Sequence, residues 1–143
     1  MAAIIKCKCR VSGKREGNLL ATDQPVSFWG GVDPEKGIIN DPRHELFGES
    51  VAGKVLAFPF GKGSTGTPMV ILELARVKKA PAALIQIKVD PLLVAGPVLC
   101  KHLYGEAFPV VTVDHEEFQQ LKTGRHALVD GSKGEIILSG SNY

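Results

Sequence analysis

The stretch that decides the fold is VAGKVLAFPFGKGSTGTPMVILELARVKK, residues 51–79. Its apolar run at residues 55–58 has the length of a buried strand, and the polar segment after it holds three glycines within residues 61–66. A helix is predicted next, with Thr67 as its cap and Pro68 at its first position, where a missing N–H group is harmless. The stretch therefore predicts a strand, a glycine-rich loop and a helix in succession.

The glycine-rich loop also has the clearest chemical potential in the chain. Free backbone N–H groups, the positive end of the helix dipole and the ammonium group of Lys62 are all expected near Ser64. Such a place binds an anion, and it favours the ionised form of a neighbouring hydroxyl group. Glycines at this spacing equally suit a tight strand-to-helix turn with no chemistry, so the loop by itself leaves both interpretations open.

Length and composition limit the architecture and the class of partner. The chain has 143 residues, enough for one domain over 1–143 and too few for two. Its formal net charge is only +2 and its basic residues are scattered, so no nucleic acid partner is expected. No apolar run has the length of a membrane span, and residues 1–10 do not resemble a signal peptide. We therefore expect a cytoplasmic protein with no membrane contact.

The cysteines Cys7, Cys9 and Cys100 include no C-x-x-C pair. An odd number at this spacing fits neither a disulfide framework nor a zinc site, and it does not resemble the thiolate set of an iron–sulfur cluster. Cys7 and Cys9 alternate with charged residues, as on one face of a half-buried strand. We expect both to face the core as small apolar side chains, and we expect no metal ligand in this chain.

Residues 5–11 alternate between apolar and polar side chains, which is the period of a half-buried strand. A charged turn between Gly13 and Gly17 follows, and residues 17–22 are predicted to return as the second strand of a hairpin. The remaining elements are strands at 83–89, 108–113, 127–129 and 135–138, a helix from Asp90 to Tyr104 that Pro97 should break or kink, and a helix capped by Asp114 that stops at Gly124. This order, β-rich, then βαβαβα, then a hairpin, predicts a mixed α/β fold.

Residues 27–50 contain Gly, Pro, Asp and Asn too often for a long helix or strand, so a long ordered loop is predicted there. Loops of this length in a compact domain usually carry function. Trp29, Arg43 and His44 are therefore candidates for lining a site or an interface. The structural alternatives are that Trp29 covers the end of the core and that His44 hydrogen-bonds a turn.

Three functions are compatible with the glycine-rich loop. The first is a dinucleotide site with Asp90 as its ribose-binding acid, but a β-rich segment precedes the supposed first strand and the chain is too short for the usual six-stranded sheet. The second is a non-catalytic module that binds an anion or a partner. The third is a catalytic Ser64 in a site that another chain completes, since the sequence contains no G-x-S-x-G elbow or obvious triad.

The segments SFWGGVDPEKGIIN (27–40), GESVAGKVL (48–56), GKGST (61–65) and APAA (80–83) occur together in this chain. With them the chain resembles the small subunit, or swivel domain, of the aconitase X family, from the N-terminal strand to LKTGRHALVDG at 121–131. The resemblance implies a single swivelling β/β/α domain, similar to phosphohistidine domains, with a mixed sheet or barrel flanked by helices. It also implies a heteromeric hydro-lyase, active only when this small subunit docks on a large subunit that holds the iron–sulfur cluster.

In that family the proton-accepting serine lies in a G-[KR]-G-S motif, which Gly61, Lys62, Gly63 and Ser64 match. The resemblance implies that Ser64 abstracts the substrate's proton while the partner's cluster accepts the leaving hydroxyl group. It also implies substrate contacts from Gly61, Lys62, Gly63 and Thr65. Relatives dehydrate cis-3-hydroxy-L-proline or 5-phosphomevalonate. GKGST resembles the phosphomevalonate type, whereas FWGGVDP and VLCKHLYGEAFPVV resemble the hydroxyproline type, so the substrate stays open between the two.

Overall fold

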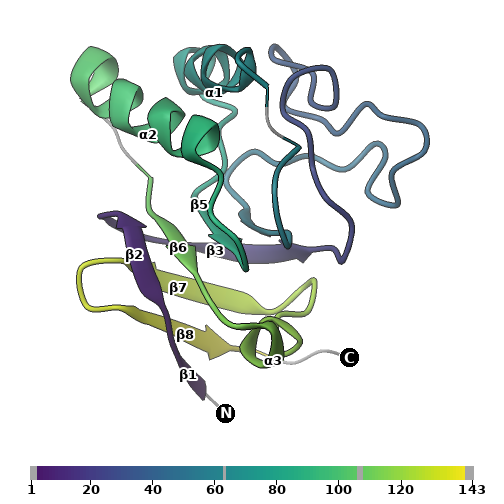
Figure 1. Cartoon of the computed structure of the whole chain (residues 1–143). Helices are drawn as coiled ribbons and strands as arrows, with labels where there is room; N and C mark the ends of the chain where they lie inside the picture. The colour runs from purple at the N-terminus through teal and green to yellow at the C-terminus, as the bar shows by residue number, and fades with distance from the viewer. Residues whose placement is uncertain (1–2, 63, 106–107, 141–143) are drawn as a thin grey trace.

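The computed structural model describes residues 3–62, 64–105 and 108–140, and Figure 1 shows their path. The order of elements follows the prediction: strands first, then alternating strands and helices, then a final hairpin. The strands are β1 (Ala3–Lys6), β2 (Lys8–Val11), β3 (Lys14–Ala21), β4 (Val55–Ala57), β5 (Ala83–Gln86), β6 (Val110–Thr112), β7 (His126–Asp130) and β8 (Glu135–Ser139), and the helices are α1 (Thr67–Arg76), α2 (Pro91–Tyr104) and α3 (His115–Phe118).

The strands form one sheet in the order β1-β8-β7-β3-β4-β5-β6-β2. From β3 to β6 the neighbours are parallel, and the other pairs are antiparallel. β1 and β2 are separated only by Cys7, yet they pair with opposite ends of the sheet, β8 and β6. The N-terminal segment thus joins both ends, and the sheet curls into a barrel-like shape, as predicted.

Two apolar clusters hold the sheet, one on each of its faces. β4 and β5 are buried along their whole length, which is typical of parallel strands covered on both sides. Along β4, Leu56 packs on the helix side, whereas Val55 and Ala57 pack inside the barrel. Burial of one such large apolar side chain contributes about 1.5–3 kcal/mol, so these two clusters are the main source of stability.

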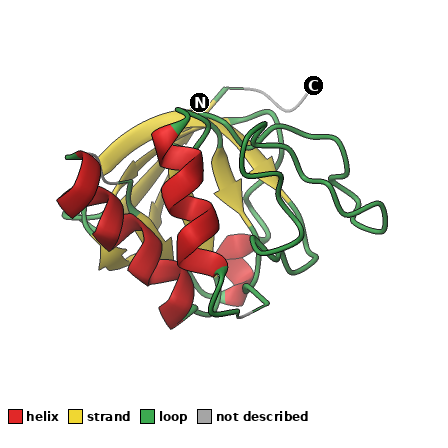
Figure 2. Ribbon diagram, turned by 90° about the horizontal axis from the view of Figure 1, so that it is seen from above, coloured by secondary structure: helices red, strands yellow, loops and turns green. Residues whose placement is uncertain are grey.

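α1 and α2 lie side by side over one face of the sheet (Figure 2). Their close approach depends on Gly96 of α2, where a Cβ atom would lie 2.8 Å from Cβ of Ile71 on α1. The loop between β3 and β4 extends to one side of this helix pair. The short α3 instead packs its Phe118 into the barrel cluster. The helix pair therefore covers the parallel strands, and both helices begin where those strands end.

The predicted hairpin between residues 5–11 and 17–22 is wrong. β2 pairs with β6, and β3 pairs with β4 and β7, so the two N-terminal segments are not neighbours in the sheet. Gly13, with a φ of +144°, redirects the chain between them. The single strand predicted over residues 5–11 is two strands, β1 and β2, and β3 begins at Lys14, inside the predicted turn. The partner of a strand depends on how both faces of the whole sheet are buried, which local patterns do not reveal.

Cys7 and Cys9 do not share an environment. Cys7 is half-buried against the barrel cluster, whereas Cys9 is exposed, so the prediction that both face the core is wrong for Cys9. The pairing of β2 with β6 shifts register between Cys9 and Val11. A shift of one residue moves a side chain to the other face of a sheet, and a short sequence pattern does not reveal it.

The start of α1 also differs from the prediction. Gly66 occupies the cap position, whereas Thr67 is the first helical residue, is 1% exposed and donates or accepts no capping bond. The residue at which a helix begins differs by one or two positions from its sequence signal, so the residue type alone did not fix the cap.

The other two helices differ in length. α2 runs from Pro91 to Tyr104 with no break at Pro97; Asp90 caps its start, and Pro97 lies on its buried face. α3 ends at Phe118, well before Gly124, because the chain leaves the helix to pair with β3: the N–H group of Gly124 donates to the carbonyl of Leu19 at 3.0 Å.

Candidate active site

The carboxyl ends of the parallel strands meet at one edge of the sheet, where α/β sheets commonly bind ligands. β4 leads there into residues 58–66 and α1, and β5 leads into residues 87–90 and α2. Backbone bonds tie these segments together, since the N–H groups of Ile87 and Lys88 both donate to the carbonyl of Pro59 at 3.0 Å. The glycine-rich loop therefore lies where the topology alone would place a site.

Ser64 is half-buried just before α1. Its Oγ accepts a hydrogen bond from the N–H group of Gly66 at 3.2 Å, and its carbonyl accepts one from Thr67 at 3.1 Å. The positive end of a helix favours a nearby negative charge by about 0.3–1 kcal/mol. The Ser64 hydroxyl group is therefore held where an ionised oxygen would be stabilised.

Trp29 brings the long loop onto the glycine-rich loop. A Cβ atom at Gly66 would lie 2.3 Å from Cε3 of the indole ring, so this approach requires glycine. The carbonyl of Val26 accepts the N–H group of Lys62 at 3.3 Å, and Val26 also forms a parallel bridge with Gly61. Trp29 remains 57% exposed. It therefore lines the candidate site and is not a cover for the end of the core.

Asp90 reaches the same loop from the start of α2. Its Oδ1 accepts the N–H group of Leu92 at 3.0 Å and so caps the helix. A Cβ atom at Gly61 would lie 2.7 Å from its Oδ2, which means that the loop backbone packs directly on this carboxyl group. Asp90 thus acts as a helix cap that supports the loop, and this role replaces the ribose-binding role considered from the sequence.

The predicted substrate contacts lie around Ser64. Lys62 and Thr65 are exposed and Gly61 is half-buried, whereas Gly63 lies outside the described residues. Within the described ranges, the Lys62 ammonium group makes no hydrogen bond or ion pair with another side chain. Its convergence on Ser64 stays a prediction.

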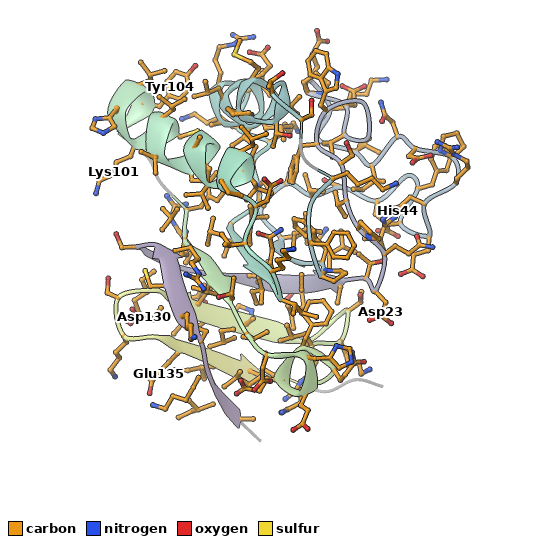
Figure 3. All side chains as sticks on the ribbon, in the orientation of Figure 1. Asp23, His44, Lys101, Tyr104, Asp130 and Glu135 are labelled. Carbon is orange, nitrogen blue, oxygen red and sulfur yellow. The ribbon has the colours of Figure 1, made fainter. Side chains whose placement is uncertain are left out.

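His44 and Arg43 do not join the site. Nδ1 of His44 accepts the N–H group of Leu46 at 3.0 Å, which leaves Nε2 to donate to the carbonyl of Pro25 at 3.1 Å. The ring therefore joins two parts of the long loop, as the structural alternative predicted, and Figure 3 shows it within that loop. Arg43 is exposed and contacts Asp41 at 3.5 Å.

Four exposed apolar side chains come from the glycine-rich loop and the segments next to it, and we call them the apolar rim: Trp29, Phe60, Met69 and Leu92, which are 57%, 46%, 64% and 36% exposed. They come from the long loop, the glycine-rich loop and the first turns of the two long helices. Phe60 also lines an open hollow of about 550 Å³, together with Asp23, Pro59, Ile87, Lys88, His115, Phe118 and Gln119. The sequence analysis missed the rim because its members are far apart in the chain.

The described residues do not fit a metal cluster. Within residues 3–62, 64–105 and 108–140, no three His, Cys, Asp or Glu side chains are grouped so as to hold a metal ion. Cys100 is buried in α2, and burial raises the pKa of the Cys7 thiol to about 11, so Cys7 stays protonated at neutral pH. In the same part of the chain, no helix has the length and apolar character needed to cross a membrane.

The fold and the position of the loop define a swivel domain, and comparison with known proteins narrows this class. The protein-family model described as the aconitase X swivel domain matches residues 4–138 of this chain. The chain belongs to this family, and its membership confirms the predicted family and the predicted class of enzyme, a dehydratase subunit.

Individual relatives are similar over nearly the whole chain. The phosphomevalonate dehydratase small subunit of Methanothrix thermoacetophila is 40% identical over 94% of this chain and 93% of its own length. The cis-3-hydroxy-L-proline dehydratase of Hypocrea jecorina is 38% identical over 91% of this chain, which spans 22% of that longer protein. The crystal structure of Thermococcus kodakaraensis aconitase X in its holo-form matches with a TM-score of 0.86 at 36% identity, over 96% of this chain and 99% of that one. The predicted fold class is thereby confirmed.

Proposed function

We propose that this chain is the small subunit of a heteromeric hydro-lyase that dehydrates a small hydroxy acid, with Ser64 as the general base. The observation that carries this proposal is the hydroxyl group of Ser64, held at the carboxyl edge of the sheet by the N–H group of Gly66. The named relatives support the reaction class, and they leave 5-phosphomevalonate and cis-3-hydroxy-L-proline as the two candidate substrates. We also propose that residues 1–143 form one domain of a cytoplasmic enzyme.

In the proposed reaction, Ser64 removes a proton from the carbon next to the one that bears the hydroxyl group. The proton passes to Oγ of Ser64, the electron pair of the C–H bond forms the C=C bond, and the C–O bond breaks. The hydroxyl group leaves as hydroxide and becomes water by taking a proton from solvent, while Ser64 returns its proton to solvent. The hydrogen bond from Gly66 and the positive end of α1 together favour the ionised serine by about 2–4 kcal/mol. A serine hydroxyl group needs more help than this to act as a base at neutral pH. Further positive charge, from Lys62 or from the partner, is therefore part of the proposal.

A large subunit is proposed to complete the site over the apolar rim. Ser64 is half-buried, and the rim on the neighbouring segments exposes apolar side chains that a second chain would cover. Substrate contacts are assigned to Gly61, Lys62, Gly63 and Thr65. The iron–sulfur cluster expected for the family is assigned to the large subunit, since the described cysteines of this chain do not fit one.

The experiment co-expresses this chain with its large subunit under anaerobic conditions and assays both candidate acids with the pair and with each chain alone. We expect activity only in the pair. Ser64→Ala should lower turnover by about 10²–10⁴-fold, the usual contribution of a general base, without changing assembly. The control is Ser132→Ala, an exposed serine in the turn between β7 and β8, which should leave turnover unchanged.

The same experiment separates the alternatives. Near-normal turnover of the Ser64→Ala pair would show that another group is the base. Assembly without turnover of either acid would direct the search to other hydroxy acids. No complex at all would favour the second candidate, a non-catalytic anion- or partner-binding module of the same fold.

A further inference from the structure

Gln86 is a fully buried glutamine whose amide has no partner. It is the last residue of β5 and is 0% exposed. Within the described residues, neither its Oε1 nor its Nε2 is hydrogen-bonded. Buried polar groups in proteins are almost always paired, because an unpaired one loses its hydration and gains nothing in return. Folding alone therefore does not explain a glutamine at this position.

Strand alternation places the Gln86 side chain between the sheet and the helices. Ile85 and Ile87, on either side of it, both pack with the barrel cluster, so Gln86 points to the opposite face. On that face Leu84 and Phe58 belong to the apolar cluster under α1 and α2. Gln86 thus brings one amide into a layer that is otherwise apolar.

The position along β5 is the edge that carries Ser64. Gln86 directly precedes Ile87, whose N–H group donates to Pro59 at the start of the glycine-rich loop. Thr67, in the first turn of α1, is 1% exposed and also has an unpaired Oγ1. Throughout the described part of the chain, these two residues are the only ones with an unpaired buried side-chain nitrogen or oxygen. One unpaired group therefore lies within the segments that form the candidate site, and the other lies directly before one of them.

We propose that the Gln86 amide binds the polar end of the hydroxy-acid substrate, an inference that rests on the function proposed above. A primary amide offers two donors and one acceptor. The substrate's hydroxyl group donates to Oε1, and a carboxylate oxygen accepts from Nε2. The apolar surroundings strengthen both bonds, since a hydrogen bond is stronger where the local dielectric constant is low. Because Gln86 is 0% exposed in the free chain, the proposal requires that its amide becomes accessible when substrate binds in the assembled enzyme.

The test compares Gln86→Leu with the unchanged chain in the assembled enzyme. Leucine has a similar volume and removes the unpaired amide, so the Tm measured without substrate should stay the same or rise. The KM for the accepted acid should rise roughly tenfold or more, as expected when a bond to a charged group is lost. The rise in Tm that the unchanged enzyme shows on addition of the acid should disappear.

A matched control is Thr112→Val. Thr112 is 4% exposed and pairs with Gln86 in the sheet register, but its Oγ1 has a partner, the Nε–H group of Arg10 at 3.2 Å. This variant removes a satisfied bond, so its Tm should fall or stay the same while KM is unchanged.

Each outcome decides between the two proposals. A lower Tm for Gln86→Leu with an unchanged KM would show that the amide is satisfied within the protein and would overturn the inference while leaving the proposed function intact. A substrate-induced rise in Tm that needs Gln86, without any turnover, would overturn the proposed reaction and keep the binding role. If the unchanged enzyme neither binds nor converts either acid, both proposals fail.

Discussion

The indole ring of Trp29 lies so close to the backbone of Gly66 that a Cβ atom at residue 66 would be 2.3 Å from Cε3 of the ring. The N–H group of the same glycine donates to Oγ of Ser64 at 3.2 Å. One backbone position therefore connects the long loop to the proposed base. A substitution at Trp29 or at Gly66 is therefore expected to change the position of the Ser64 hydroxyl group.

Gly66→Ala should lower both stability and turnover. The backbone of Gly66 has a φ of −80°, which alanine adopts without strain, so the effect would come from the added methyl group against Trp29. Overpacking of this kind typically lowers the free energy of unfolding by about 1–3 kcal/mol. Thermal unfolding of the single variant and turnover of its assembled enzyme would measure both effects.

The double variant Trp29→Ala with Gly66→Ala is the control for that prediction. Because it removes the ring that the methyl group meets, it should recover part of the stability lost in Gly66→Ala. Strictly additive losses would show that the two residues are not coupled through this contact.

Asp90→Ala and Asp114→Ala form a matched pair of cap variants. Asp90 accepts the N–H group of Leu92 at 3.0 Å, and Asp114 accepts that of Glu117 at 2.8 Å. Each substitution should lower the free energy of unfolding by about 1 kcal/mol, measured by denaturant titration. Only Asp90→Ala should also lower turnover, because only Asp90 packs against Gly61 in the candidate site. An equal loss of turnover in both variants would mean that stability alone explains the effect.

Met69→Ser should weaken binding of the large subunit, and Leu103→Ser should not. The two side chains are about equally exposed, at 64% and 63%, but Met69 belongs to the apolar rim, whereas Leu103 lies near the C-terminal end of α2, the end where Figure 3 labels Lys101 and Tyr104. A buried apolar contact at an interface typically contributes about 1–2 kcal/mol. Calorimetric titration of the two subunits measures the difference. If Leu103→Ser weakens binding more than Met69→Ser, the interface lies along α2 and not over the rim.

Cys7 should react with an alkylating reagent far more slowly than Cys9. Burial, with a further contribution from Cys9 and nearby carboxylates, raises the pKa of the Cys7 thiol to about 11. Below that pH the thiol is mostly protonated, and only the thiolate reacts, so labelling of Cys7 should rise about tenfold per pH unit between about pH 7 and pH 9. Cys9 is exposed and should be labelled first. Peptide mapping of a timed iodoacetamide reaction follows both sites, with Cys9→Ser as the control, and equal labelling rates near neutral pH would contradict the prediction.

Much of the local structure and the centre of the candidate site follow from the sequence. The strand, loop and helix of residues 51–79 were predicted from local patterns, because side-chain period and the conformational demands of glycine and proline act over a few residues. The same stretch singled out Ser64, and the structure places it at the carboxyl edge of the sheet. The family was also recognisable, since its motifs are short and contiguous.

Only the tertiary structure determined the relationships between segments that are far apart in the sequence. The partners of β2 and β3, the exposed position of Cys9 and the contact of Trp29 with Gly66 each depend on chain segments far apart in the sequence. Gln86 is the clearest case, because a glutamine in a predicted strand gives no sign that its amide is buried and unpaired. Burial of a side chain is set by everything that packs around it, whereas a sequence pattern reports only its neighbours along the chain.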